Sequence, residues 1–287
     1  IVKRRYDRMI RVGYTRTELV ERVEELQHEL IREALHITGI KEQIEIGTLG
    51  DIHAAGSGLG SSSTVTVGVL NALYTYINQP QCLEMLAQQA CEIEIDRLGK
   101  PIGKQDQYIA AYGGMQFIRF LPDERVIVEK VKLESGDWHR LNQQLMLFDT
   151  NHVRKSESVL FEQQENIHIR KEALRKLRDM AYQARKLIEA GALDEFGELL
   201  HEGWMVKKSL ASRISNPEID EQYERARRAG AIGGKITGAG GGGFLLLYCP
   251  RGKLDSVRAA MGGLSELPFH LEPDSTKVIL NYRRQGA

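Results

Sequence analysis

A glycine- and serine-rich stretch, residues 56–63, constrains the fold of this chain more than any other feature. Its sequence, Gly-Ser-Gly-Leu-Gly-Ser-Ser-Ser, has glycine at every second position at first, which allows sharp turns and a close approach of ligand to backbone. Apolar side chains then recur at every fourth position from Val65 to Ile77, so residues 64–77 are predicted to form a helix. A helix N-terminus presents N–H groups and the positive end of the helix dipole, which suit a phosphate. The stretch therefore predicts a phosphate site, with a flexible turn and a serine N-cap as the alternative.

Two common phosphate fingerprints do not fit this stretch. It lacks the Gly-Lys-[Ser/Thr] ending of a Walker loop, and Ser61 stands where the dinucleotide fingerprint has its last glycine. Gly238, Gly240 and Gly243 do have the G-x-G-x-x-G spacing. However, residues 244–249 resemble a buried strand, whereas a dinucleotide site needs a helix there. The second match is therefore accidental.

Length and composition exclude several classes of protein. A chain of 287 residues is long enough for two lobes, and Lys plus Arg equals Asp plus Glu at 39 each, so no overall charge favours nucleic acid or an anionic membrane. The longest apolar run, 244–249, is too short to span a bilayer. The three cysteines form no C-x-x-C pair, which indicates a reducing cytoplasmic location and argues against zinc. The chain starts at Ile1 within strand-like sequence, so we expect an N-terminal piece to be missing.

Strand and helix patterns change near residue 150. Before it, extended segments are predicted at 1–14, 44–49, 115–121, 126–133 and 145–149, helices at 17–36, 64–77 and 83–98, and a polar loop at 101–107. After it, we predict helices at 155–190, 193–201, 203–213, 218–229 and 253–262, and strands at 244–249 and 276–282. The fold class is therefore α+β with two lobes. These are a mixed strand-and-helix lobe, residues 1–150, and a helix-rich α/β lobe, residues 151–287.

Glu94 is the first candidate for chemistry. On the predicted 83–98 helix it lies on the same face as Ala87 and Ala90, which points inward. A buried carboxylate is unfavourable unless it is paired or binds a metal, so Glu94 is either a metal ligand or a partner in an interior salt bridge or hydrogen bond.

Asp106 and Lys104 lie in the polar loop that follows. A loop carboxylate beside a phosphate site can take a proton from a hydroxyl nucleophile or bind a metal, and a lysine can neutralise a phosphoryl group in transfer. The alternative is an ordinary aspartate that caps the helix of Tyr108.

A second glycine-rich segment spans residues 238–243. Five glycines among six residues leave almost no side chain in the way of a ligand or of a facing loop. The segment is predicted to be either a glycine-rich hairpin or a second loop that closes over nucleotide phosphates or substrate.

Together these motifs resemble those of the GHMP small-molecule kinases, a family that includes galactokinase and the homoserine, mevalonate and phosphomevalonate kinases. Gly58-Leu-Gly-Ser-Ser62 is similar to the family's second motif and Gly238-Ala-Gly-Gly-Gly242 to its third. Pro101-x-Gly-x-x-Asp106-Gln107 is similar to the galactokinase loop with the catalytic aspartate. The likeness covers nearly the whole chain and is strongest to the bacterial D-glycero-D-manno-heptose 7-phosphate kinases, through residues 56–63, 92–96, 103–107 and 199–202. The family's first motif, an N-terminal strand with a Gly-Gly-x-x-Asp-like turn, is absent, which fits a missing N-terminal piece.

The resemblance implies a role for each motif. The residues that would wrap the ATP phosphates are Gly56, Ser57, Gly58, Leu59, Gly60, Ser61 and Ser62. Ser62 and Glu94 would hold Mg²⁺, and Asp106 would be the base that activates the sugar hydroxyl. Lys104 is the second catalytic candidate because of its charge, and not through the resemblance. The glycines at 238–242 would help shape the cleft, and the candidates for substrate binding there are Gly238, Ala239, Gly240 and Gly241.

A phosphorylated acceptor would also need cations away from ATP. The candidates are Lys3, Arg5 and Arg154, although the basic patch around Lys3 can equally be a solvated strand edge.

The resemblance thus implies an ATP- and Mg²⁺-dependent sugar kinase. The favoured acceptor is the anomeric hydroxyl of D-glycero-D-manno-heptose 7-phosphate, which would give the 1,7-bisphosphate for surface-polysaccharide precursors. The alternatives are a kinase for another sugar such as galactose or fucose, a non-catalytic ATP- and sugar-binding sensor, and a diphosphate decarboxylase on the same scaffold. We expect the protein to bind a small sugar phosphate and to bind neither nucleic acid nor a membrane. The sequence does not determine the oligomeric state, for which a homodimer is one option.

Overall fold

The computed structural model describes residues 1–50, 56–152 and 156–282, and their contacts group the chain into two units. The first unit comprises Ile1–Ile52, Gly60–Gly114 and Glu272–Ala287, and the second comprises His53–Leu59 and Met115–Leu271. The chain passes from the second unit into the first between Leu59 and Gly60, inside the glycine- and serine-rich stretch. The predicted α+β class with two lobes is confirmed. The contacts do not divide the chain at the predicted residue 150, because the strand just before it pairs inside the second unit.

A four-stranded sheet of order β1-β4-β2-β3 forms one side of the first unit. Its strands are β1 Val2–Arg4, β2 Ile10–Gly13, β3 Thr17–Val20 and β4 Ile44–Gly47. Strand β4 runs parallel to β2 and antiparallel to β1, and β3 is antiparallel to β2. Along β2 and β4 every second side chain is buried, as the period of a strand requires: Ile10, Val12, Ile44 and Ile46.

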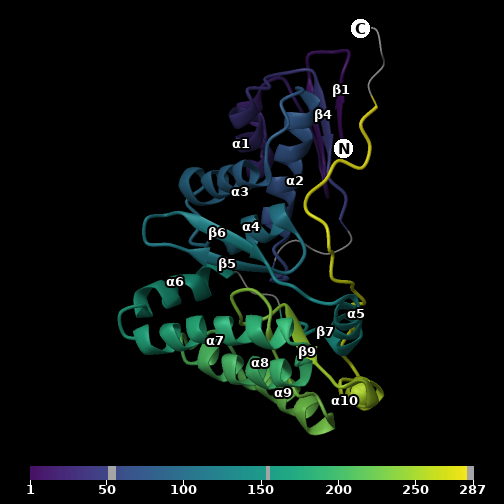
Figure 1. Ribbon diagram of the computed structural model, residues 1–287. Helices are drawn as coiled ribbons and strands as arrows, with labels where there is room; N and C mark the ends of the chain where they lie inside the picture. The colour runs from purple at the N-terminus through teal and green to yellow at the C-terminus, as the bar shows by residue number, and fades with distance from the viewer. Residues whose placement is uncertain (51–55, 153–155, 283–287) are drawn as a thin grey trace. The chain divides into compact units, whose positions relative to one another are not determined.

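Helices complete the first unit (Figure 1): the 3-10 turn η1 Val23–Glu25, α1 Glu29–Thr38, α2 Ser61–Tyr76, α3 Leu83–Cys91, the π-helical turn η2 Glu92–Arg97 and α4 Gln105–Tyr112. Helices α1 and α2 pack together, as do α3 and α4. The described C-terminal stretch also belongs here, because Thr276 N donates to Ala111 O at 3.0 Å and Gly114 N donates to Glu272 O at 3.0 Å.

The second unit contains a hairpin, a three-stranded antiparallel sheet and most of the later helices. Its strands are β5 Gln116–Phe120, β6 Val126–Lys130, β7 Leu145–Asp149, β8 Gly233–Ile236 and β9 Phe244–Tyr248. Its helices are α5 Ser135–Gln144, α6 Ser156–Asn166, α7 Lys171–Glu189, α8 Leu193–Lys208, α9 Pro217–Ala229, η3 Arg251–Lys253 and α10 Leu254–Ala260.

The core of the second unit lies around its three-stranded sheet. The sheet has the order β7-β9-β8, and α8 packs against both β8 and α7 (Figure 1). Trp204 of α8, Tyr223 of α9 and Phe148 of β7 are among the largest side chains buried there. The glycine-rich segment 238–243 lies in the connection between β8 and β9, so the hairpin topology is correct.

Four predicted elements are wrong. The predicted helix 155–190 is two helices, α6 and α7, because a turn interrupts it at residues 167–170. Residues 17–36 do not form one helix, because residues 17–20 pair with β2 and α1 begins only at Glu29, where His28 accepts the N-cap hydrogen bond. The predicted helix 203–213 does not exist as a separate element, since α8 continues without a break to Lys208. Residues 276–282 are not a strand, because Thr276 bonds to the end of α4 instead of to a sheet edge.

None of the helices in the described part of the chain is long and apolar enough to cross a bilayer.

Candidate active site

Helix α2 begins where the glycine- and serine-rich stretch ends. Gly60 is the N-cap, with φ of 70°, and Thr64 N makes the helical hydrogen bond to Gly60 O at 3.0 Å. No side chain of the described residues caps this end. The predicted alternative of a serine N-cap is therefore wrong, since a glycine in the left-handed region takes that position. An uncapped helix end retains the N–H donors and dipole that bind anions.

Glu94 lies close to this helix end. Its side chain is fully buried, together with Ala87 and Ala90, so the predicted inward face is confirmed. Ser62 Oγ donates to Glu94 Oε2 at 2.9 Å, whereas Glu94 Oε1 is buried without a hydrogen-bond partner among the described residues. Glu94 lies in the π-helical turn η2, a distortion that is frequent at functional sites. A buried anionic oxygen without a partner is unfavourable unless a cation or donor joins it.

The Ser62–Glu94 pair therefore fits a bound divalent cation. Among the residues that the structure describes, no group of three or more His, Cys, Asp or Glu side chains could hold a metal by itself. Mg²⁺ does not require such a group, because it commonly binds one or two carboxylates and completes its shell with phosphates and water. Glu94 Oε1 and Ser62 Oγ could supply the two protein oxygens.

Asp106 lies beside the N-cap of α2. It is in the first turn of α4 and not in a loop as predicted, because the helix starts at Gln105 despite the glycine and proline before it. A Cβ atom on Gly60 would lie 3.6 Å from the Asp106 carboxyl carbon. The fold thus brings the predicted base against Gly60, inside the predicted phosphate site.

Two tyrosines hold α4 in this position. Tyr108 Oη and Tyr112 Oη donate to the two carboxylate oxygens of Glu84 on α3, at 2.8 and 2.9 Å. Burial, with the Glu84 hydrogen bond as the second cause, raises the pKa of Tyr112 to about 12. The sequence analysis did not identify this anchor, because the spacing of the two tyrosines is visible but their shared partner lies 24 residues before one and 28 before the other.

Lys104 immediately precedes α4 and occupies its N-cap position. Lys104 lies near enough to the buried thiol of Cys91 to affect its pKa. Burial raises the pKa of Cys91 to about 12; the positive charge of Lys104 lowers this pKa, and the negative charge of Glu94 raises it. Lys104 and Glu94 therefore both act on the same thiol, and the fold brings together Ser62, Glu94, Lys104 and Asp106 in the first unit.

The two glycine-rich segments meet inside the second unit. A Cβ on Gly58 would lie 2.8 Å from Thr237 O, and a Cβ on Gly238 would lie 2.7 Å from Gly58 Cα. Thr237 Oγ1 also donates to Ser57 O at 3.1 Å. Both glycines have positive φ, so their sequence signal reflects backbone packing in addition to any ligand.

The remaining predicted substrate residues are placed as follows. Ala239 O accepts a hydrogen bond from Gln163, and Gly241 N donates to Ile214 O at 2.7 Å. A Cβ on Gly240 would lie 2.7 Å from the same Ile214 carbonyl oxygen. Arg154 lies outside the described residues. Substrate contacts of all these residues stay predictions.

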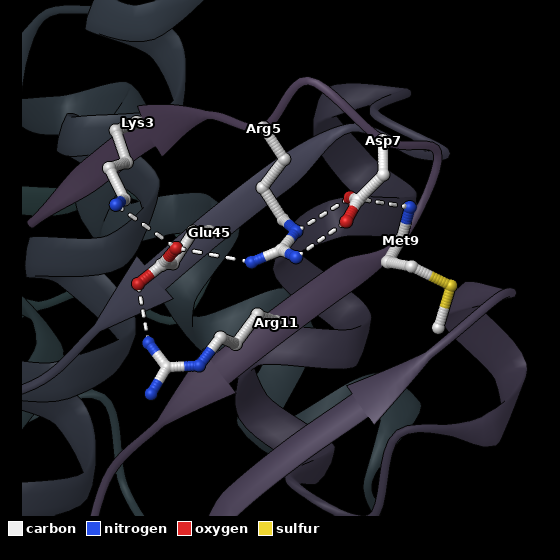
Figure 2. Close-up of polar contacts among 6 residues, drawn as sticks. All are labelled: Lys3, Arg5, Asp7, Met9, Arg11 and Glu45. Carbon is white, nitrogen blue, oxygen red and sulfur yellow. Dashed lines mark hydrogen bonds and ion pairs between the residues drawn. The ribbon is translucent and has the colours of Figure 1, made fainter.

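Lys3 and Arg5, the other candidates for a substrate phosphate, have carboxylate partners on the first unit's sheet (Figure 2). Arg5 donates to both oxygens of Asp7, at 2.7 and 2.6 Å, and its pairing lowers the pKa of that carboxyl group. Glu45 pairs with Lys3 at 3.2 Å, with Arg5 at 3.3 Å and with Arg11. The pairing favours a solvated strand edge over a phosphate site at Lys3 and Arg5.

Comparison with known proteins identifies the family. The model of the GHMP kinases N terminal domain matches residues 15–114, and the model described as GHMP kinases C terminal matches residues 184–264. The chain belongs to the GHMP kinase family. The match to the N-terminal model ends at residue 114, and the segment Gly60–Gly114 of the first unit ends at the same residue.

Several proteins of the GHMP kinase family resemble this chain. D-glycero-alpha-D-manno-heptose 7-phosphate kinase from Campylobacter jejuni is 32% identical over 208 residues, which are 71% of this chain and 61% of that protein. The bifunctional fucokinase/GDP-fucose pyrophosphorylase of Arabidopsis thaliana is 28% identical over 76% of this chain and 22% of that protein. The crystal structure of a D-glycero-D-manno-heptose 1-phosphate kinase from Bacteroides thetaiotaomicron superposes with a TM-score of 0.78, at 26% identity over 96% of this chain and 84% of that chain. This chain thus spans about three fifths of the Campylobacter jejuni relative's length.

Proposed function

We propose that this GHMP kinase family member transfers the γ-phosphoryl group of ATP to the anomeric hydroxyl of D-glycero-D-manno-heptose 7-phosphate. The product would be the 1,7-bisphosphate, a precursor for surface polysaccharide. The observation that carries the proposal is the buried Glu94 carboxylate, which accepts a hydrogen bond from Ser62 in the first turn of α2. Asp106 lies against Gly60, the N-cap of the same helix. The similarity to heptose phosphate kinases supports the choice of acceptor.

Each residue has a defined task in this reaction. The stretch 56–62 and the N–H groups at the start of α2 bind the ATP phosphates. Ser62 and Glu94 hold Mg²⁺, which, when bound, neutralises phosphate charge. Asp106 accepts the proton of the sugar hydroxyl as its oxygen bonds to the γ-phosphorus and ADP departs. Lys104 stabilises the negative charge of the phosphoryl group in transfer.

A substrate panel with ATP tests the proposal. ADP release would be followed with heptose 7-phosphate, unphosphorylated heptose, galactose, fucose and mevalonate, and each product would be identified by mass spectrometry and NMR. We expect turnover of heptose 7-phosphate with phosphate added at the anomeric carbon, and loss of turnover in Asp106→Asn. Binding of ATP and sugar without transfer to any acceptor would instead support the sensor.

A kinase for fucose or galactose is the second candidate, favoured by the likeness to the fucokinase. Preferred turnover of either sugar over heptose 7-phosphate would establish it. The cytoplasmic location, the absence of nucleic acid and membrane partners, and a homodimer remain predictions.

A further inference from the structure

Lys207, a lysine outside all of the quoted motifs, lies where the two glycine-rich segments of the second unit meet. It is in the last turn of α8, and its Nζ donates to Gly238 O at 2.5 Å. Gly238 in turn makes the close backbone approach to Gly58. The ammonium group of Lys207 is thus bonded directly to the loop that contacts the predicted phosphate stretch.

The charge of Lys207 is not balanced by a carboxylate. No ion pair among the described residues includes Lys207, whereas its neighbour Lys208 pairs with Asp220 at 3.0 Å. Burial, with repulsion from Lys235 on β8 as the second cause, lowers the pKa of Lys207 to about 7. Burial and a nearby like charge both oppose the charged form, and a bound anion would relieve both effects.

The geometry leaves Lys207 able to bind more than the carbonyl. An ammonium group has three donors, and Gly238 O takes one of them. A lysine is a compact point charge of the kind that binds phosphate groups. Five of the six residues at 238–243 are glycines, so few side chains of this loop would obstruct a ligand beside Lys207. Both lysines belong to elements that pack together, α8 and β8, which fixes their separation.

We propose that Lys207, assisted by Lys235, binds a phosphate group of the ligand held at the glycine-rich loop 237–243. The phosphate would come from ATP or from the phosphorylated sugar acceptor. The identity of these two ligands rests on the proposed function, whereas the anion site itself does not.

The competing role for Lys207 is purely structural, a tie between α8 and the loop. Lys207→Gln distinguishes the two, because an amide retains a donor for Gly238 O but carries no charge. Lys207→Arg retains the charge and should keep most of the binding. Lys186→Gln is the matched control: it removes one charge from the exposed surface of α7 in the same unit.

The experiment is isothermal titration calorimetry with tripolyphosphate, Mg-ATP and heptose 7-phosphate. We expect Lys207→Gln to weaken at least one of the three by roughly 10–100-fold, the value of a lost charge-assisted hydrogen bond, while Lys186→Gln and the melting temperatures stay close to those of the wild type. A loss confined to Mg-ATP assigns the site to a nucleotide phosphate, and one confined to heptose 7-phosphate assigns it to the acceptor.

Proton uptake gives a second readout that a structural tie would not produce. At pH 8 the free Lys207 is mostly neutral and a bound anion favours its charged form, so binding should take up protons. Titrations in two buffers of different ionisation enthalpy measure this uptake, which Lys207→Gln should abolish.

The inference is overturned if Lys207→Gln binds all three probes as the wild type does, or if the wild type binds none of them. A wild type that binds tripolyphosphate through Lys207 but transfers no phosphoryl group would contradict the proposed function and leave the anion site intact.

Discussion

Replacement of Glu94 by Gln should stabilise the metal-free protein and at the same time remove its productive binding of Mg-ATP. In the structure the Glu94 side chain is fully buried, its Oε2 accepts from Ser62, and its Oε1 has no described partner. If this carboxylate is present to bind a cation, then in the absence of the cation its charge is a source of instability. Glutamine has the same shape without the charge.

The change in the free energy of unfolding of Glu94→Gln follows from one favourable and two unfavourable contributions. Replacement of a buried ion pair by uncharged residues of similar volume is often neutral or stabilising by about 1–4 kcal/mol, and we take the same range for removal of the Glu94 charge. Against this, the hydrogen bond from Ser62 weakens and the new amide N–H₂ lacks an acceptor, which together cost about 1–3 kcal/mol. The middle of the two ranges gives a net gain of about 0.5 kcal/mol, or about 1–2 °C in melting temperature for a chain of this size.

Glu84→Gln is the matched control, since the substitution is the same and the site is the preceding helix α3. Glu84 accepts hydrogen bonds from Tyr108 and Tyr112, so its charge is satisfied by the protein. The substitution replaces one accepting oxygen with an N–H₂ group, which cannot accept from its tyrosine, and it removes the charge that strengthens the other hydrogen bond, so Glu84→Gln should lose about 1–3 kcal/mol. The two variants should shift the melting temperature in opposite directions.

The assay is thermal unfolding with EDTA and then with Mg-ATP. A ligand present at 100 times its dissociation constant stabilises the native state by about 2.7 kcal/mol, so Mg-ATP should raise the melting temperature of the wild type and of Glu84→Gln but much less that of Glu94→Gln. If Glu94→Gln melts below the wild type in EDTA and responds fully to Mg-ATP, Glu94 is a structural residue and the metal assignment is wrong.

Three further predictions concern single residues. Asp106→Asn should leave Mg-ATP binding nearly unchanged and lower turnover by roughly 10²–10⁴-fold, and rescue by added Mg²⁺ would show that Asp106 is a metal ligand instead of the base. Gly58→Ala should lower the free energy of unfolding by about 2–5 kcal/mol in denaturant, because the new Cβ adds left-handed backbone strain and a clash with Thr237. Gly60→Ala should lose only roughly 1–2 kcal/mol, from the strain alone, because its new Cβ makes ordinary contacts. Equal losses would contradict the close contact at Gly58. Iodoacetamide at pH 8 should modify the exposed Cys82 long before Cys91, because burial raises the pKa of Cys91 to about 12. A further rise in pH should increase the labelling of Cys91, and comparable labelling rates of the two cysteines at pH 8 would contradict that pKa.

Sequence patterns predicted those elements whose signals are local. The hairpin of β5 and β6, strand β7 and helix α2 lie close to their predicted positions, because alternation and helical periodicity persist over each of them. The prediction for residues 17–36 was wrong because apolar spacing of four also occurs across a strand and a turn, and pairing with β2 decided between the two. Asp106 entered a helix despite the breakers before it, since Tyr108 and Tyr112 of that helix have a partner on α3.

The sequence by itself determined which residues could do chemistry. It singled out the glycine- and serine-rich stretch, Glu94, Asp106 and the later glycines. A charge on an inward helical face and a cluster of glycines both lower the stability of the fold, so each suggests a functional role that compensates this cost. Only the tertiary structure decided how these residues meet. It paired Ser62 with Glu94, set Asp106 against Gly60, packed Gly58 on Gly238 and bonded Lys207 to that loop. Such contacts join residues 31 to 180 positions apart, as for Lys207 with Gly238 and for Thr237 with Ser57, and a local pattern carries no information about a partner that distant.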